Sequence, residues 1–389
     1  MSQQPIHVLF LPKWYPNKLD AFDGNFVENH AHAVKKFAKV SVIFVHSEER
    51  ENADYGLTQT MNNGITEIQV FFKKSSLGIN ILHKIQTAFR YFNAQLIAYK
   101  QLVKTSGQPD ISHIHVLTRS SLLGLYLMVF KQIPYVITEH WSGYLPINGG
   151  YKGWLKKRGT ELVVKSASGI SAVSKQLKKA MLAHQLKGDY QIIPNVVDTD
   201  LFCPFAKESA NIEILFVGNL LQSPKRILDV IEAMSFLKKK ELAFQLSIFG
   251  EGKDEQCCKE LIVKLGLENE VKLKGTLPRK GIAEVMGKAD FLILFSEFEN
   301  QPCVLNEAMA CGIPVIAPDI AGIAERLTPD LGIMIPTGDV SAFQQALLEM
   351  CNTYKEYKSD WIRERAIDQF SEDVIGKQFI NLYQTALKS

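Results

Sequence analysis

The sequence predicts an α/β protein made of two doubly wound, Rossmann-like domains. Three observations predict this fold class. Several short runs are continuously apolar rather than alternating, which is typical of strands buried on both faces of a parallel sheet. Amphipathic stretches of helix length lie between these runs. The alternation of strand and helix occurs twice within the 389 residues, on either side of a polar, proline-containing break.

The first half contains five apolar runs of strand length and three helical stretches. Their β-branched content and brevity favour strands over helix segments. The expected strands are residues 7–11, 40–45, 111–116, 135–138 and 169–173, and the expected helices are residues 26–37, 77–104 and 154–166.

The second half repeats the pattern with six apolar runs. The expected strands are residues 213–217, 244–249, 271–274, 291–295, 314–317 and 332–335. The expected helices are residues 225–239, 253–265 and 342–353, and the tail 372–388 is also helical in pattern.

The break between the halves covers residues 195–211, which are polar, follow Pro194 and include Pro204. Such a segment is typical of an interdomain linker. We therefore expect an N-terminal domain over residues 1–195, a C-terminal domain over 212–370, and a terminal helix over 371–389 that packs back towards the first domain.

Composition narrows the class of protein. The chain is 46% hydrophobic and 22% charged, as in ordinary globular proteins, and its net charge of +3 is too small to favour a nucleic-acid partner. Neither a signal peptide nor an apolar run near the ~18 residues of a membrane span is visible. The six cysteines form no C-x-x-C pair, so we expect a reduced, cytoplasmic protein.

A first group of candidate binding residues follows the strand 213–217. Gly218 ends this strand, and Lys225 and Arg226 lie where the next helix opens. A glycine lets the backbone approach a phosphate closely, and a basic side chain beside a helix start supplies charge for an anion. Solvated basic residues at a helix edge would look the same.

A second group follows the strand 291–295, near a helix that Pro302 begins and Gly312 ends. Val304, Ala308 and Cys311 form its expected apolar stripe. A carboxylate here can accept hydrogen bonds from two vicinal hydroxyls, as in a ribose. The candidate ligands are Glu299, Asn300, Gln301, Cys303 and Glu307.

The first half offers fewer candidates. Glu139 and His140 follow the strand 135–138 and are expected to face the crevice at its end. His113 and His115 share one face of a strand, but two histidines without a third ligand nearby are a poor metal signature. His115, nearer the strand end, could still line the cleft.

Glu299 and Glu307, eight positions apart and followed by Ala-Met-Ala-Cys-Gly-Ile-Pro-Val, resemble the E-x7-E signature of the retaining glycosyltransferases called family four. Phe216-Val217-Gly218-Asn219 with Lys225 is similar to the family's phosphate motif, and Ile193-Pro194-Asn195 to its linker. Asn219 and Arg226 replace the usual arginine and glycine, and Asn300-Gln301-Pro302 replaces a glycine-rich turn.

The resemblance implies the GT-B fold, in which two domains face each other across a cleft and close on their substrates. It implies a nucleoside-diphosphate sugar donor, with Glu307 on the ribose, Glu299 on the sugar and Lys225 with Arg226 on the diphosphate. His140 would lie near the donor sugar, and the loop with Gly24 and Asn25, together with His115, on the acceptor or phosphate side. The expected reaction transfers a hexosyl-type sugar, with retention, to a saccharide or lipid-linked acceptor in cell-surface polysaccharide or glycolipid synthesis.

We expect neither a metal nor a cofactor. The single D-x-D triplet, Asp198-Thr199-Asp200, lies in the linker rather than at a strand end. A nicotinamide-dependent dehydrogenase is disfavoured because Pro-Lys-Trp-Tyr-Pro, and not a glycine-rich turn, follows the first strand. A sugar-nucleotide epimerase, a phosphorylase or a non-catalytic sugar-nucleotide sensor could share the fold.

Two segments combine basic and apolar residues. Lys152, Lys156, Lys157 and Arg158 surround Trp154 and Leu155, and Lys73, Lys74 and Lys84 flank Phe89 and Phe92. Such faces can lie on an anionic membrane, although most charge runs are simply solvated. Peripheral contact with the inner face of a membrane is therefore one expectation for this protein.

Overall fold

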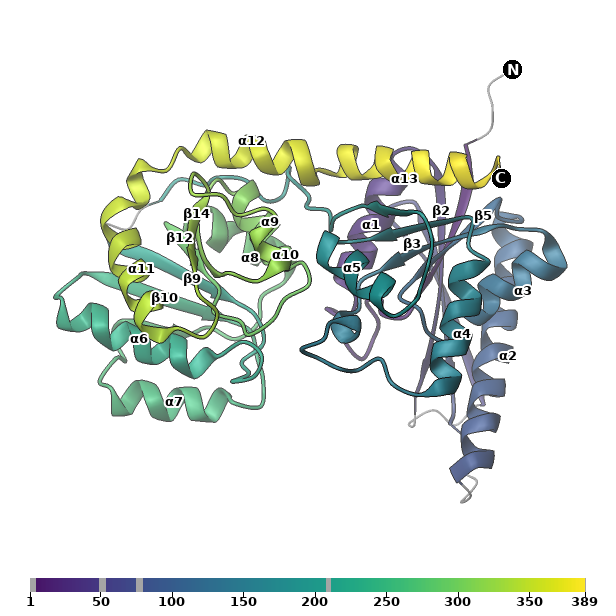
Figure 1. The fold of residues 1–389 in the computed structure, drawn as a ribbon, viewed down its shortest axis with the longest axis horizontal. Helices are drawn as coiled ribbons and strands as arrows, with labels where there is room; N and C mark the ends of the chain where they lie inside the picture. The colour runs from purple at the N-terminus through teal and green to yellow at the C-terminus, as the bar shows by residue number, and fades with distance from the viewer. Residues whose placement is uncertain (1–4, 49–53, 75–79, 208–210, 389) are drawn as a thin grey trace. The chain divides into compact units, whose positions relative to one another are not determined.

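Two parallel β-sheets organise the chain, one in each of two units (Figure 1). The computed structural model describes residues 5–48, 54–74, 80–207 and 211–388. The first unit comprises Met1–Asn195 with Glu372–Ser389, and the second comprises Val196–Ser371. Both are α/β units, as the sequence predicts.

The first unit contains an eight-stranded sheet of order β3-β4-β2-β1-β5-β6-β7-β8. All neighbouring strands are parallel except the hairpin of β3 and β4, which lies at one edge. The strands are β1 His7–Pro12, β2 Lys39–Ser47, β3 Tyr55–Asn62, β4 Ile65–Phe72, β5 Ile111–His115, β6 Tyr135–Glu139, β7 Gly169–Ala172 and β8 Tyr190–Ile192.

Helices cover both faces of this sheet. On one face α1 packs against α13, which also contacts β6 and β7, while α2 and α3 cover the opposite face. The helices are α1 Asn25–Lys35, α2 Asn80–Ser106, α3 Ser121–Lys131, α4 Trp154–Lys165, α5 Lys175–Ala183 and α13 Glu372–Ala386, with a 3₁₀ turn η1 at Ser142–Tyr144.

Successive residues of the central strands point to opposite faces, and both faces are buried. Every residue of β1, β5 and β6 is buried. Leu11 and Ile114 pack towards α3, whereas Phe10 packs against the rings of His113 and His115 on the other face. This two-sided burial explains why these strands are continuous apolar runs in the sequence.

The second unit has a six-stranded, wholly parallel sheet of order β11-β10-β9-β12-β13-β14. Its strands are β9 Ile212–Val217, β10 Phe244–Phe249, β11 Val271–Leu273, β12 Phe291–Ile293, β13 Val315–Pro318 and β14 Gly332–Ile335. Its helices are α6 Ile227–Lys239, α7 Glu255–Lys264, α8 Arg279–Gly287, α9 Cys303–Ala310, α10 Ala321–Ala324, α11 Val340–Thr353 and α12 Ser359–Phe370, with a 3₁₀ turn η2 at Tyr354–Glu356.

All eleven expected strands are present, and the structure adds elements that the sequence analysis missed. These are the strands β3, β4 and β8 and the helices α3, α5, α8, α10 and α12. Residues 77–79 of the expected helix 77–104 lie outside the described residues. The expected stripe of α9 is too narrow, because Leu305, Asn306 and Met309 are also buried.

The expected linker 195–211 is not a loose connection over its described part. Val197 and Phe202 are buried in the second unit. The guanidinium of Arg363 on α12 donates hydrogen bonds to the carbonyls of Thr199 and Phe202, both at 2.8 Å. The proline and polar residues predicted a linker here, and in the structure tertiary hydrogen bonds and two apolar anchors hold its described part against the second unit.

The C-terminal helix α13 belongs to the first unit. The Nδ1 atom of His113 lies 2.7 Å from the hydroxyl of Tyr383, and Lys36 forms ion pairs with Glu372 and Asp373. Among the described residues, no helix combines the length and apolar character needed to cross a membrane.

Candidate functional site

In both sheets the chain adds strands first on one side of a central strand and then on its other side, which creates a topological switch point. The switch point lies between β1 and β5 in the first unit and between β9 and β12 in the second. Open α/β sheets bind ligands outside the carboxyl ends of the strands at such a switch point, because the loops there separate and leave a crevice. The residues that follow β9 and β12, and those that follow β1, β5 and β6, are therefore the ones to consider.

Glycines let two loops of the second unit meet at this edge. A Cβ atom on Gly250 would lie 2.0 Å from the carbonyl oxygen of Gly218, and one on Gly252 would lie 2.3 Å from the carbonyl oxygen of Leu220. Only residues without a Cβ fit such contacts. Gly250 and Gly252 thus allow the loops after β9 and β10 to pack together, and the contact of Gly250 with Gly218 fixes the end of β9.

Lys225 and Glu299 come together at the switch point, although 74 residues separate them in the sequence. They form an ion pair, and the hydroxyl of Ser296 donates a hydrogen bond of 2.8 Å to the same oxygen of Glu299. The side chains are 21% and 14% exposed, so both remain accessible to a small ligand. Both residues were predicted donor-site residues, and the fold brings them into contact.

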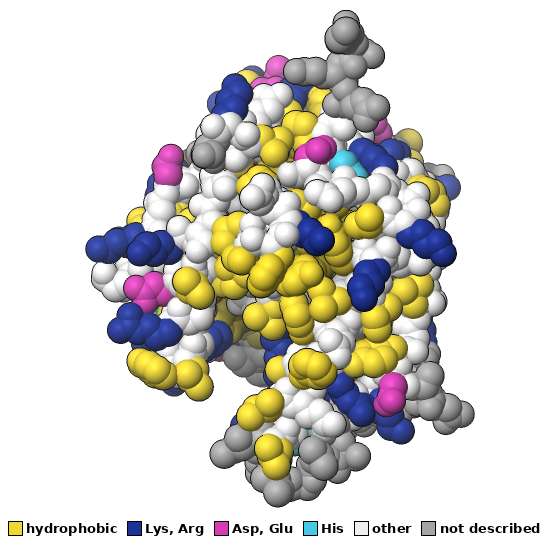
Figure 2. All heavy atoms as spheres, turned by 90° about the vertical axis from the view of Figure 1, so that its right-hand side faces the viewer, with side chains coloured by type: hydrophobic (Ala, Val, Ile, Leu, Met, Phe, Trp, Pro, Cys, Tyr) yellow, Lys and Arg dark blue, Asp and Glu magenta, His cyan; other side chains and the backbone are white. Residues whose placement is uncertain are grey.

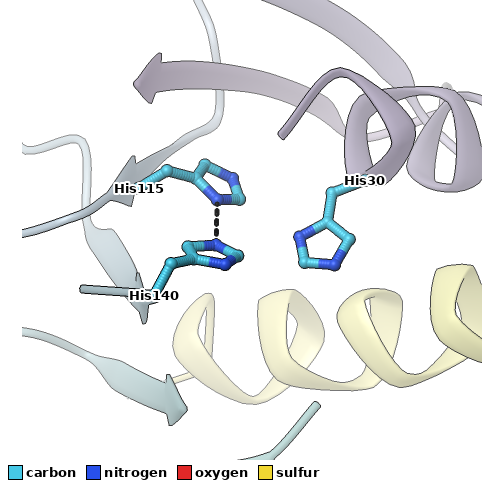
Figure 3. Close-up of side chains that lie close together, drawn as sticks. All are labelled: His30, His115 and His140. Atoms are coloured by element: carbon cyan, nitrogen blue, oxygen red, sulfur yellow. Dashed lines mark hydrogen bonds between the residues drawn. The ribbon is translucent and has the colours of Figure 1, made fainter. Parts of the chain in front are cut away.

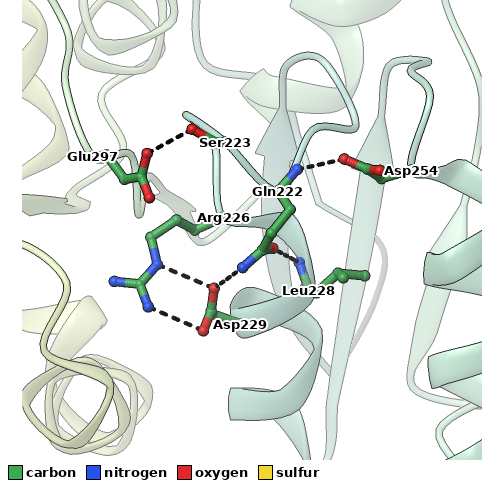
Figure 4. A network of polar contacts seen from close by, with 7 residues as sticks. All are labelled: Gln222, Ser223, Arg226, Leu228, Asp229, Asp254 and Glu297. Carbon is green, nitrogen blue, oxygen red and sulfur yellow. Dashed lines mark hydrogen bonds and ion pairs between the residues drawn. The ribbon is translucent and has the colours of Figure 1, made fainter.

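The charge of Arg226 is balanced within its own helix. Its Nε and Nη2 atoms donate hydrogen bonds of 3.1 Å each to the carboxylate of Asp229 (Figure 4). Its guanidinium lies 4.8 Å from the ring centroid of Phe295. The contact of Arg226 with a diphosphate stays a prediction. In such a contact the diphosphate would compete with Asp229 for the guanidinium of Arg226.

A polar network fixes the loop that carries these basic residues (Figure 4). The side chain of Gln222 donates to Asp229 at 2.5 Å and accepts from the amide of Leu228 at 3.0 Å. The hydroxyl of Ser223 donates to Glu297 at 2.8 Å, which connects the loops after β9 and β12. The side chains at the switch point are therefore held by a preorganised frame.

Glu307 is a carboxylate in an apolar setting on α9. Burial raises its pKa to about 7, and the guanidinium of Arg279 opposes that rise. Arg279, the first residue of α8, was missed by the sequence analysis, and its position after Pro278 at a helix start was the available signal. Burial thus disfavours the ionised form of this carboxyl group, and the nearby guanidinium favours it.

Cys303 lies one turn before Glu307 on α9. Burial and the nearby carboxyl group of Glu307 raise the pKa of its thiol to about 12, which favours the neutral thiol over the thiolate. Gln301 is buried directly before the helix. A Cβ on Gly322 would lie 2.1 Å from the carbonyl oxygen of Asn300, so the backbone after Glu299 packs closely against α10.

In the first unit, Glu139 organises the end of β6. Its buried carboxylate accepts hydrogen bonds from the amides of Leu117, His140 and Trp141 at 2.9–3.0 Å. Burial raises its pKa, and these three amides oppose the rise. The side chain is thus occupied in holding the loops after β5 and β6, and it fixes the backbone of His140.

Three buried histidines converge near this point (Figure 3). Nδ1 of His115 lies 3.2 Å from Nε2 of His140, and the ring of His30 from α1 lies 5.3 Å from that of His140. Burial lowers the pKa of all three, that of His30 to about 4, so the rings are neutral. His140 and His115 were predicted site residues, whereas no sequence pattern marked His30.

These three histidines could hold a metal ion, because one ring nitrogen from each lies within 4.8 Å of the others. Three imidazoles match the donor preference of zinc. Apolar rings enclose the group, with Phe10 against His115 and Phe26 against His140. His113 is not part of this group, since both its ring nitrogens are hydrogen-bonded, one to Tyr383 and the other to Thr138.

Gly24 stands between β1 and α1 with a left-handed backbone, at a φ of 65°. A Cβ there would lie 2.2 Å from the carbonyl carbon of Trp14. The loop therefore folds back on itself before Asn25 begins α1. This close approach explains the glycine by packing alone, and a contact of Gly24 or Asn25 with a phosphate stays a prediction.

Comparison with known families covers most of the chain. Residues 24–201 match the family described as Glycosyltransferase Family 4, and residues 197–366 match the family described as Glycosyl transferases group 1. The two matches follow one another along the sequence, one for each unit.

The curated relatives are similar over part of their length. The N-acetyl-alpha-D-glucosaminyl L-malate synthase of Bacillus anthracis is 26% identical over 51% of this chain and 55% of its own. The putative colanic acid biosynthesis glycosyltransferase WcaL of Escherichia coli is 29% identical over 46% of this chain and 47% of its own. The match thus spans about half the length of these relatives.

Solved structures match over nearly the whole chain. The sucrose-phosphate synthase of Thermosynechococcus elongatus superposes with a TM-score of 0.76 at 17% identity, covering 98% of this chain and 99% of its own. HepE of Anabaena, solved with UDP and glucose, gives a TM-score of 0.68 at 17% identity, covering 98% of this chain and 100% of its own. With two parallel-sheet units, charged side chains at the second switch point and family matches along both, the chain belongs to glycosyltransferase family 4 and has the GT-B fold.

Proposed function

We propose that this protein is a retaining glycosyltransferase that moves a hexosyl-type sugar from a nucleoside-diphosphate sugar to a saccharide or lipid-linked acceptor. Family membership and the names of relatives such as WcaL support a role in cell-surface polysaccharide or glycolipid synthesis. HepE was solved with UDP and glucose, which makes UDP the first nucleotide to test.

The observation that carries the proposal is the group at the second switch point, where the Lys225–Glu299 pair and the partly buried Glu307 share one sheet edge. Glu307 would accept hydrogen bonds from the two ribose hydroxyls. Glu299 would bind hydroxyls of the sugar, and Lys225 with Arg226 would bind the diphosphate. Gly218, Asn300, Gln301 and Cys303 would line the donor.

The chemistry follows from these roles. The bond between the anomeric carbon and the phosphate oxygen breaks while an acceptor hydroxyl forms its bond on the same face. The departing phosphate oxygen takes the proton of that hydroxyl, and Lys225 stabilises the developing negative charge. The neutral imidazole of His140 would support the donor sugar by a polar contact rather than act as a base, an assignment that rests on the family resemblance.

The proposal includes no metal and no cofactor. Fixed cations, Lys225 and Arg226, would take the place that a divalent ion has in other transferases. We further propose that the protein acts in the cytoplasm, at the inner face of a membrane where a lipid-linked acceptor would be presented.

Isothermal titration calorimetry with UDP tests the donor site. Replacing Glu307 by Ala should weaken binding by at least 10-fold, since two charge-assisted hydrogen bonds are lost. Glu284→Ala, an exposed carboxylate on α8, is the matched control and should bind as the parent does. Unchanged affinity in the Glu307 variant would remove this residue from the site.

Incubation with a panel of nucleoside-diphosphate sugars and candidate acceptors then tests the reaction. Release of nucleoside diphosphate with a new glycoside of unchanged anomeric configuration, assigned by NMR, is expected. Interconversion of the free sugar nucleotide would instead indicate an epimerase, and binding without turnover of any donor would indicate a sensor.

A further inference from the structure

The helices α2, α3 and α4 of the first unit differ in charge from the rest of the chain. Together they carry nine lysines or arginines and a single acid, Glu161, so their net charge is +8. The remaining residues carry a net charge of −5, because the chain as a whole has +3.

The same three helices expose apolar side chains. Of the 24 large hydrophobic residues exposed among the described residues, eleven lie on α2, α3 and α4. Phe89, Phe130, Trp154 and Leu155 are each more than 60% exposed. Isolated exposed apolar residues are ordinary, but a contiguous group marks a binding surface.

These side chains form one surface. The ring of Phe92 on α2 contacts that of Tyr126 on α3, which in turn contacts the exposed ring of Phe130. The hydroxyl of Tyr135 in β6 bonds to the carbonyl of Val163, so α4 covers the same sheet next to α3. Figure 2 shows a continuous hydrophobic area with lysines and arginines around it and few acids. We call this surface, made by the outward side chains of α2, α3 and α4, the basic apolar face.

We propose that the basic apolar face binds the surface of an anionic phospholipid membrane. Seven of the nine cations on these helices are lysines, whose long stems can lie along apolar surface while the ammonium groups stay at the headgroups. Arg90 does not contribute in this way, because it forms an ion pair with Asp54. Protein interfaces are depleted in lysine, which disfavours a protein partner. Nucleic acid would leave Phe89, Phe130 and Leu155 without apolar contacts.

The face also reaches the candidate acceptor side of the first unit. The Nζ atom of Lys156 on α4 lies 3.8 Å from the ring centroid of Trp141, the residue after His140. A membrane held by this face would therefore lie near the carboxyl edge of the first sheet. The binding itself goes beyond the proposed transfer reaction, and only the use of this edge for a lipid-linked acceptor rests on that reaction.

Vesicle flotation with the full chain tests the proposal. We expect binding to vesicles of phosphatidylcholine with 30% phosphatidylglycerol and little binding to pure phosphatidylcholine, and the binding should weaken as salt is raised. No binding to either vesicle, or equal binding to both, would overturn the proposal.

Two double variants separate the apolar and the charged contributions. Trp154→Ser with Leu155→Ser, and Lys131→Glu with Lys157→Glu, should each reduce the partition coefficient by about 10-fold or more. The matched control changes Val263→Ser and Lys264→Glu on the exposed side of α7, and it should bind as the parent does. Loss of binding in the control, or unchanged binding in both test variants, would contradict the assignment.

Thermal unfolding should be the same for all variants, because every changed side chain is exposed. UDP affinity should also be unaffected, so failure of membrane binding and failure of the donor site are distinguished by separate measurements.

Discussion

The two units of this protein share a doubly wound topology and a switch point, but they equip that edge with opposite chemistry. In the first unit the edge carries neutral, buried imidazoles and a buried carboxylate, Glu139, that accepts hydrogen bonds from backbone amides. In the second unit it carries an accessible ion pair and a carboxylate poised near pH 7. The fold therefore determines where each candidate site lies, at the switch point of its sheet. The side chains at that edge determine whether a charged group is available to a ligand.

The largest effect is expected at the second switch point. If Lys225 stabilises the leaving group as proposed, Lys225→Ala should reduce turnover by roughly 100-fold or more, because that fixed cation is lost and Glu299 is left without its partner. Steady-state rates with the best donor measure this, and Lys264→Ala on the exposed side of α7 is the control. A rate within a few-fold of the parent's would place charge stabilisation elsewhere.

The first unit should respond differently. His140→Asn is expected to lower kcat by about 10-fold while leaving UDP affinity nearly unchanged, because a neutral contact that matters in the transition state is lost. His113→Asn, which breaks the bonds to Tyr383 and Thr138, should instead lower the melting temperature. If His140→Asn weakened UDP binding as strongly as turnover, the contrast between the two edges would fail.

The pH dependence of stability should have opposite signs for groups at the two edges. The pKa of His115 is lowered on folding, so the unfolded chain binds more protons and this histidine costs stability as the pH falls below 6.5. The pKa of Glu307 is raised to about 7, so the native state binds more protons and stability falls as the pH rises from 4.5 towards 7.

Urea unfolding at pH 5 and pH 8 measures the contributions of Glu307 and His115 to the free energy of unfolding. The difference in free energy of unfolding between Glu307→Gln and the parent should be about 1–2 kcal/mol more favourable to the variant at pH 8 than at pH 5. For His115→Gln the difference should be more favourable to the variant at pH 5 than at pH 8. Parallel pH profiles for the two variants would show that the edges do not differ in this respect.

The smallest effect concerns metal ions. Treatment with EDTA should leave the transfer rate unchanged, since the proposed reaction uses protein cations. Loss of activity that manganese restores would contradict this. Restoration by zinc, abolished in His30→Asn, would point instead to the histidine group of the first unit as a metal site.

The sequence alone determined much of the fold. The buried strands are recognisable because burial on both faces requires continuous apolar runs, and this held for all eleven expected strands. The hairpin of β3 and β4 was missed although its turn, Asn63-Gly64, has the positive φ values of 47° and 81° that an Asn-Gly turn favours. Its edge strand β3 is largely exposed, so the apolar signal was weak.

The residues of the second switch point could also be predicted from the sequence, because Glu299 and Glu307 lie on one short segment and Lys225 follows a strand end. The contacts that these residues make could not be predicted from the sequence. Only the tertiary structure decided that Lys225 pairs with Glu299, that Asp229 neutralises Arg226, and that Arg279 lies close enough to Glu307 to lower its pKa. The convergence of His30, His115 and His140, from three different elements, is likewise invisible in sequence spacing. Local patterns fix which segments become strands and helices, whereas pairing and pKa depend on distances between segments that only the folded chain sets.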